Sequence, residues 1–214
     1  MGKYVAGIVV IIILFVYIKI KQQLKEANFL NDILYNEKDP NKFVDEMDTI
    51  LSKNQTEKNK VINTIQKTTG LLYAGKFNEV VETLDSINNA PKNWLPIYYQ
   101  NLVLSLYFKK DKNRANEIFK RAKPVFEEYK KNQYYKDFIE IVYSVSDFYN
   151  GKGSKSFYYD LAETGDNDYR KALGYYYLGM INKKEKQTEE MDKNFNKAIE
   201  YGKGSFIEKF AKEQ

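Results

Sequence analysis

The chain has 214 residues and a formal net charge of +5, and it contains neither cysteine nor histidine. These absences exclude disulfides, thiolate or imidazole metal sites, thiol nucleophiles and every acid-base mechanism that depends on histidine. Apolar residues make up 43% of the chain, which is enough for a packed core. With only four prolines and eleven glycines, the composition favours long helices joined by short turns over sheets.

The excess positive charge is concentrated at the N-terminus. Residues 1–25 hold four lysines and no acidic residue, so the rest of the chain carries 30 basic and 29 acidic side chains. A nearly neutral body lacks the basic stripe that phosphate binding requires, whereas lysines beside an apolar segment are typical of a membrane surface. The sequence therefore predicts no nucleic-acid partner.

Residues 1–20 are predicted to be a single transmembrane anchor. Residues 4–18 (YVAGIVVIIILFVYI) carry no charge, and residues 1–20, which include the flanking lysines, make a helix of about 30 Å, which can span a lipid bilayer if Lys3 and Lys19 extend to its surfaces. A cleaved signal peptide is the main alternative, but a lysine-rich segment follows the apolar run where a small-residue cleavage site would be expected. A buried core helix is the other alternative, and it is disfavoured because the segment is apolar all round.

The lysines around the anchor predict its orientation. Three lysines follow the apolar segment and one precedes it. Because positive charge is retained on the cytoplasmic side, we expect a single-pass protein of the cell membrane with its C-terminal domain in the cytoplasm. The amino terminus adds a second positive charge before the segment, so the opposite orientation stays open.

Residues 21–56 are predicted to form a juxtamembrane helical hairpin, or neck. Apolar residues recur at helical spacing from Gln22 to Tyr35, and Asn36–Asn41 then breaks the pattern. Pro40 suits the first turn of the next helix, which carries a second apolar stripe from Phe43 onward. We expect this stripe to cover the edge of the helices that follow.

Four helical pairs are predicted after the neck. The first three are residues 61–73 with 78–87, 95–108 with 113–129, and 134–149 with 154–164, and the fourth surrounds residues 175–198. The helices of the third pair are the least regular, because the second of them is short and lacks the alanine and phenylalanine found in the others. Ala115 and Met191 are 76 residues apart, about twice a repeat length, and this spacing places one further pair between them.

The fourth pair carries an ordered set of large and small residues: Tyr175, Leu178-Gly179, Met191, Phe195 and Ala198. Gly179 would let the two helices pack closely, with Phe195 filling the space between them. The second pair repeats the small, aromatic, small series at Ala115, Phe119 and Ala122, and GKFNEVVETL in the first pair looks like a turn and second helix of the same kind. In these respects residues 57–214 resemble a tetratricopeptide-repeat (TPR) domain. The resemblance implies an all-α solenoid after the anchor, with another helical bundle as the alternative.

No residue pattern predicts an enzyme. Gly151–Ser156 is the only segment that is similar to a phosphate-binding loop, and it lacks both the hydroxyl residue after Gly-Lys and a preceding strand. A turn with Ser154 as the N-cap of the next helix is the better interpretation. Clustered carboxylates such as Glu79, Glu82 and Asp85 fall on predicted outer helix faces. We expect no catalytic, cofactor or metal site.

TPR geometry implies that the first helices of successive pairs line a concave, partner-binding groove. Because the implied lining is apolar and aromatic with few charges, we expect an apolar peptide or a helix as the ligand. The residues that this geometry places in the groove are Ile65, Thr69, Tyr73, Gln100, Leu104, Tyr107, Tyr176 and Met180.

The predicted function is a membrane-tethered scaffold or adaptor of a bacterial type that binds a protein partner at the inner membrane face. An extracytoplasmic, chaperone-like or secretion-associated module with the anchor reversed is the alternative. Self-association is a further possibility, because Phe206, Ile207 and Phe210 form an apolar stripe where a solenoid would be expected to end in a polar cap.

Overall fold

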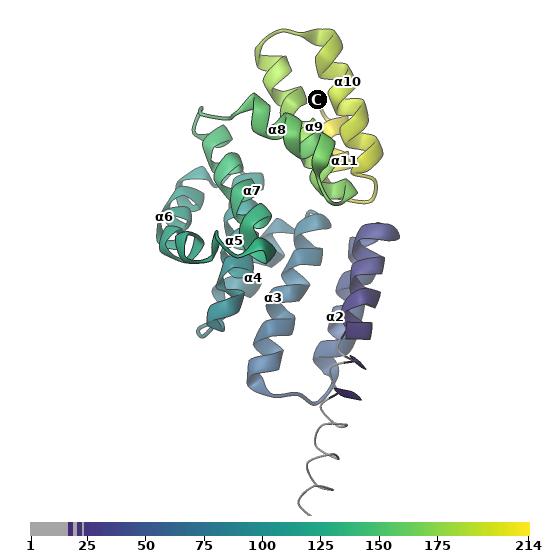
Figure 1. The fold of residues 1–214 in the computed structure, drawn as a ribbon, viewed down its shortest axis with the longest axis vertical. Coiled ribbons are helices and arrows are strands. Elements are labelled where there is room, and N and C mark those ends of the chain that lie inside the picture. The colour runs from purple at the N-terminus through teal and green to yellow at the C-terminus, as the bar shows by residue number, and fades with distance from the viewer. Residues whose placement is uncertain (1–16, 19–20, 23) are drawn as a thin grey trace, which may run out of the picture.

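The structure is a computed structural model that describes residues 17–18, 21–22 and 24–214. Helices form most of this part of the chain and no strand occurs in it, so the expected all-α class is confirmed (Figure 1). After helical residues 24–31, the elements are η1 (Asp32–Asn36), α2 (Pro40–Ser52), α3 (Glu57–Tyr73), α4 (Phe77–Asp85), η2 (Lys92–Trp94), α5 (Leu95–Phe108), α6 (Lys112–Tyr129), α7 (Gln133–Tyr149), α8 (Lys155–Thr164), α9 (Asp168–Lys184), α10 (Thr188–Tyr201) and α11 (Phe206–Lys212).

The predicted anchor falls largely on residues that the structure does not describe, since residues 4–16 lie outside the described range. Among the helices that are described, none has both the length and the hydropathy needed to cross a bilayer.

Four equivalent turns mark four helical pairs. The turns after α3, α5, α7 and α9 each contain one residue with a left-handed backbone, namely Gly75, Lys110, Gly151 and Lys186. In every case the following amide donates to a carbonyl five residues earlier, as Asp111 does to Leu106 at 2.9 Å, which is the Schellman pattern that ends a helix. The four residues are 35, 41 and 35 positions apart. The expected helical pair between the second and the fourth pair is therefore confirmed. The longest interval, 41 residues, separates the turn of the second pair from the turn of the third.

The predicted packing of the fourth pair is confirmed. A Cβ atom on Gly179 of α9 would lie only 2.6 Å from the Phe195 ring of α10. The missing side chain thus creates the space that the ring fills, and Phe195 is almost fully buried.

The third pair differs from the others, as its irregular sequence indicated. Its second helix, α8, packs mainly on the following helix, α9. The two helices cross with their backbones in contact, because a Cβ on Gly174 would lie 2.5 Å from the amide nitrogen of Ala162. The predicted N-cap of α8 is confirmed, since the Ser154 hydroxyl accepts from the Phe157 amide.

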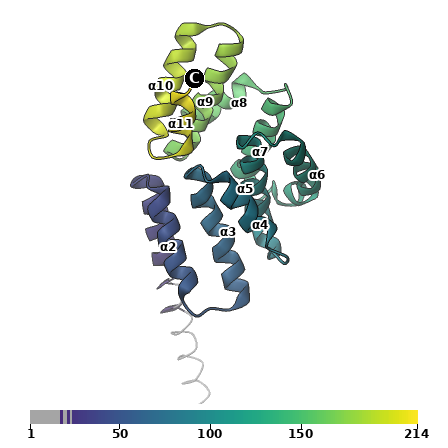
Figure 2. The same cartoon turned by 180° about the vertical axis from the view of Figure 1, so that it is seen from behind.

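The neck forms the expected hairpin, and Pro40 occupies the first turn of its second helix. Its apolar stripe packs against α3, where Gly70 leaves room for the Phe43 ring. Residues 24–36 and α2 lie beside α3 at one end of the molecule, whereas α9, α10 and α11 group together at the other (Figures 1 and 2).

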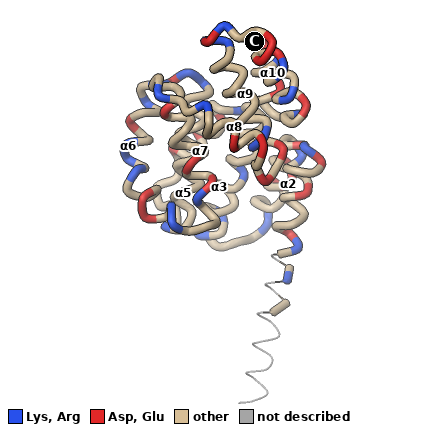
Figure 3. Tube along the Cα trace, turned by 45° about the horizontal axis from the view of Figure 1, so that its top comes forward, with Lys and Arg blue, Asp and Glu red and all other residues tan. Residues whose placement is uncertain are grey.

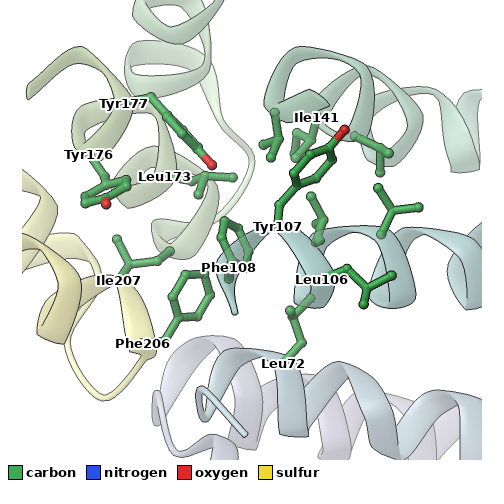
Figure 4. Close-up of a cluster of buried hydrophobic side chains, with 14 of the residues drawn as sticks. Leu72, Leu106, Tyr107, Phe108, Ile141, Leu173, Tyr176, Tyr177, Phe206 and Ile207 are labelled. Atoms are coloured by element: carbon green, nitrogen blue, oxygen red, sulfur yellow. The ribbon is translucent and has the colours of Figure 1, made fainter. Parts of the chain in front are cut away.

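The last helix returns to the first pair. The Phe206 ring lies 5.2 Å from that of Phe77 and 4.6 Å from that of Phe108, between centroids. Figure 4 shows Phe206 and Ile207 facing side chains of α3 and α5 within one buried cluster. The expectation that Phe206, Ile207 and Phe210 form an exposed stripe is therefore wrong. Phe206 and Ile207 are buried and Phe210 is half-buried, because α11 packs back onto the first helical pair and α5.

A second contact joins the neck to the fourth pair. The Lys38 ammonium group lies 2.6 Å from the Asp168 carboxylate at the start of α9. Beside it, the rings of Tyr35, Tyr73 and Tyr169 cluster, with 4.6 Å between the centroids of the last two. The neck, the first pair and the fourth pair therefore meet, and they surround the hollow described below.

Candidate functional site

A hollow opens between the neck helix and the first helices of the four pairs. It has an outer part of about 600 Å³, here called the outer hollow, and a deeper part of about 100 Å³, here called the inner pocket. The two parts share Asn31, Tyr35, Tyr134 and Phe138. This arrangement makes one recess that narrows from a wide mouth to a small floor.

Amides and carboxylates dominate the outer hollow. The neck helix contributes one set of these side chains and the start of α9 contributes the other, with aromatic rings between them. The full lining is Asn28, Asn31, Asp32, Tyr35, Asn36, Tyr134, Phe138, Asp166, Asn167, Asp168 and Arg170.

The inner pocket has no charged side chain in its lining. Its walls are aromatic and aliphatic, with a few amides and one hydroxyl. The lining residues are Asn31, Leu34, Tyr35, Phe43, Gln66, Thr69, Leu72, Tyr73, Trp94, Ile97, Gln100, Asn101, Tyr134 and Phe138. Asn101 is already engaged, because its amide group donates to the hydroxyls of Thr68 and Thr69 at 3.0 Å.

Gln100 differs from its neighbour Asn101. Its side chain is only 8% exposed, and it borders both the inner pocket and a smaller cavity beneath it. Within the described part of the chain, no group donates to or accepts from this side-chain amide. Among the described residues, the buried side-chain atoms without a hydrogen-bond partner are Ser105 Oγ, Tyr169 Oη, Tyr177 Oη and Asn182 Oδ1, so the Gln100 amide is instead open to the pocket that it borders.

Arg170 forms part of the wall, and its charge is already compensated. Its Nη1 atom lies 2.9 Å from the Asp137 carboxylate and 3.1 Å from that of Asp166. The guanidinium also stacks over the Phe138 ring, 4.6 Å from its centroid. These contacts hold α7 and α9 together at the edge of the recess.

Tyr35 and Tyr73 of the recess are neutral at physiological pH. Burial raises the pKa of Tyr35 and of Tyr73 above the ordinary value for a phenol. Their hydroxyls therefore act as hydrogen-bond donors and acceptors and contribute no charge.

Acidic residues extend beyond the outer hollow. A neighbouring recess of about 250 Å³, here called the side hollow, lies between α7, α8 and α9 and shares Asp166 and Arg170 with it. It adds three further carboxylates, those of Asp137, Glu140 and Asp160. Together the two hollows carry six carboxylates and one guanidinium. This face is acidic although the chain as a whole is basic and both signs are interspersed over most of its surface (Figure 3).

Three of the eight predicted groove residues meet in the inner pocket: Thr69, Tyr73 and Gln100. Leu104 lies in the smaller cavity beneath, together with Tyr73 and Gln100. Thr69, Tyr73 and Gln100 thus border the recess, whereas Leu104 is buried and lines only the small cavity.

The other four predicted residues lie elsewhere. Ile65 and Tyr107 are fully buried, so they belong to the core and cannot contact a partner. Tyr176 is also buried, and Met180 is half-buried against the main core. Figure 4 shows Tyr107 and Tyr176 within the interior cluster. The expectation of an apolar lining rested partly on these side chains; the inner pocket has such a lining, and the outer hollow, which adds carboxylates, was not part of the predicted groove.

Several residues that line the recess were not predicted from the sequence, because they lie outside the positions predicted on the first helix of each pair. Asn31 and Tyr35 belong to the neck, which was expected to cover an edge and in fact forms a wall. Tyr134 is 64% exposed and stands next to buried Tyr135, and the doublet signalled one outward ring without showing what it faces. Arg170, one of three arginines in the chain, was the other available signal.

Comparisons with protein-family models, with curated proteins and with solved structures found no match to this chain.

Proposed function

We propose that this chain is a TPR-like, membrane-tethered interaction module that holds a segment of a partner protein in the recess. The repeat of four equivalent turns supports the solenoid assignment. The observation that carries the binding proposal is the inner pocket itself, whose uncharged and largely aromatic lining includes the Gln100 amide, a group that forms no hydrogen bond within the described part of the chain. A core position would favour an apolar residue there, whereas a binding position makes use of the free amide.

The predicted anchor gives the module its location. With residues 4–18 in the bilayer, the helix that leads from the anchor into the neck would hold the recess close to the membrane surface. A tethered module meets membrane partners at high effective concentration, so moderate affinity is sufficient. A scaffold or adaptor with its body in the cytoplasm is the function that these features support best.

Site-specific photocrosslinking in the native cell tests the binding proposal. A photoreactive phenylalanine at position 134 faces the recess, and the same group at position 159 is a matched control, because Tyr134 and Tyr159 are 64% and 59% exposed and Tyr159 lies outside the recess. We expect a discrete adduct from position 134 that is absent from position 159. Equal labelling from both positions, or none from position 134, would contradict the proposal.

Protease accessibility in sealed cells tests the orientation separately. With the body in the cytoplasm, the chain resists added protease until the cells are opened. Cleavage in sealed cells would place the body outside and leave the crosslinking result to be interpreted for an extracytoplasmic module.

A further inference from the structure

The recess combines three chemical environments in a fixed order. The inner pocket is uncharged and largely aromatic, Gln100 stands at its floor, and the mouth is acidic. We infer that the occupant is an extended segment of a partner protein in which a bulky uncharged side chain lies next to lysine or arginine. This inference rests on the proposed function and specifies the chemistry of its ligand.

The inner pocket selects the bulky side chain. Its volume of about 100 Å³ and its lining by Tyr73, Trp94 and Phe138 suit one aliphatic or aromatic group. A charged group would lose its hydration there without gaining an opposite charge, because no lining residue is ionised.

Gln100 selects a polypeptide backbone. A primary amide can donate to a carbonyl and accept from an N–H group at the same time, which is the pairing that an extended chain offers. Occupation would thus exchange solvent at this amide for a backbone partner inside the uncharged pocket.

The mouth selects positive charge. Of the carboxylates in the outer and side hollows, Asp166 and Asp137 contact Arg170, Asp168 contacts Lys38, and Glu140 lies 3.9 Å from Lys136. Within the described part of the chain, Asp32 is bonded only to the Asn36 amide. The exposed ring of Tyr134 stands beside them and can stack with a cation. An acidic segment would be repelled by this rim, so charge complementarity favours a basic one.

Selection from a randomised twelve-residue peptide display library tests the inference. The bait is the full chain in phosphatidylcholine nanodiscs, with empty nanodiscs for counter-selection, so that basic peptides are not retained by anionic lipid. We expect enriched peptides to carry a bulky apolar residue within two positions of lysine or arginine. Their affinities are then measured by fluorescence anisotropy.

Two variants separate the parts of the recess. Asp32→Lys should weaken the enriched peptides at least tenfold, whereas Asp45→Lys, the same charge change on an exposed carboxylate of α2 outside the recess, should change affinity less than twofold. Gln100→Met, which keeps the volume and removes the amide, should weaken binding about tenfold while the free protein becomes no less stable. If Gln100 had only a structural role, Gln100→Met would instead lower the stability of the free protein and leave its affinity for the peptides unchanged.

The possible results distinguish this inference from the proposed function. Enriched peptides that are acidic or uncharged, and that lose binding in Tyr134→Ala, would overturn the basic segment and leave the recess as the binding site. Peptides that bind Tyr134→Ala as well as the unaltered chain, or a selection that enriches none, would overturn both.

Discussion

Tyr107 joins three helices through its hydroxyl group. The oxygen lies 2.6 Å from the side chain of Asn116 in α6 and 2.9 Å from that of Ser146 in α7, while the ring stacks on Tyr149. Tyr107→Phe keeps the stack and leaves two polar groups without this partner, so we expect the free energy of unfolding to fall by about 1 to 2 kcal/mol. Chemical unfolding followed by circular dichroism measures the change. Tyr159→Phe, at an exposed ring, is the control and should have almost no effect.

Lys186 occupies the left-handed turn of the fourth pair, with φ of 59°. The equivalent turns of the first and third pairs use glycine, which adopts this conformation without steric cost. Lys186→Gly should therefore raise the free energy of unfolding by about 1 kcal/mol. Lys186→Ala removes the same charge but keeps the strain and should give no gain. Equal effects of the two variants would show that the ammonium group, and not the backbone, determines stability at this position.

The tyrosine clusters show how far single residues could be predicted. A half-buried helix places one ring of an adjacent pair inside and the other outside, and Tyr134 with Tyr135 and Tyr158 with Tyr159 show this arrangement, whereas Tyr98 and Tyr99 are both half-buried. Tyr175, Tyr176 and Tyr177 depart from it, because all three are buried. Helical periodicity predicts which rings share a face, but it gives no indication that neighbours cover every face of a helix, as they do for α9.

At the scale of elements, α11 is a short helix with a well-formed start. The Ser205 hydroxyl accepts from the Ile207 amide, and the Glu208 carboxylate accepts from the Gly204 amide at 2.8 Å, an arrangement close to a capping box. The hydrogen bond from Lys212, followed by that from Gly204, holds the pKa of Glu208 below its ordinary value. The helix start is therefore stabilised by an ionised carboxylate.

Glu208→Gln should lower the free energy of unfolding by no more than about 1 kcal/mol at neutral pH, since the carboxylate is partly exposed. Because the folded-state pKa is lowered, the stabilisation is present above the unfolded-state pKa of about 4.3 and is lost as pH falls through the folded-state value. Unfolding curves between pH 3 and 7 should thus converge for the two proteins at the acidic end. Curves that remain parallel would exclude the carboxylate charge as the source.

The sequence predicted nearly all of the helices and their turns, because caps, glycines and apolar spacing are local signals. It could not predict which helix α8 would pack against. The close approach of Gly174 to Ala162 depends on two residues whose contact becomes visible only after α8 and α9 are placed. Local pattern predicts an element, whereas the choice of its neighbour depends on the shape of the whole core.

At the scale of the whole molecule, the recess exists because the fourth helical pair and α11 pack back onto the neck and the first pair. The walls of the recess come from the neck and from the first helices of the four pairs. The neck contacts the fourth pair through Lys38 and Asp168, and the first pair contacts α11 through Phe77 and Phe206. The predicted groove assumed an open solenoid in which only successive repeats touch. For that reason it included residues that closure has buried, such as Tyr107, and omitted the neck residues that closure has brought in, such as Asn31.

The contact between α11 and the first two helical pairs leads to a prediction that would not hold for an open solenoid. Phe206→Ala removes a buried ring between α11 and the first two pairs and should cost about 3 to 5 kcal/mol. Phe210→Ala, at a half-buried ring of the same helix, is the control and should cost less.

The helices in which Phe206→Ala speeds amide hydrogen exchange are more informative than the total loss of stability. In an open repeat array each unit depends only on its neighbours, so loss of the last helix would speed amide hydrogen exchange in α9 and α10 alone. In the closed molecule Phe206→Ala should also speed exchange in α3, α4 and α5, about 100 to 150 residues away in sequence, because Phe77 and Phe108 lose their partner. Faster exchange confined to α9, α10 and α11 would mean that the contact between the ends contributes little, and that the recess is not held in shape by closure.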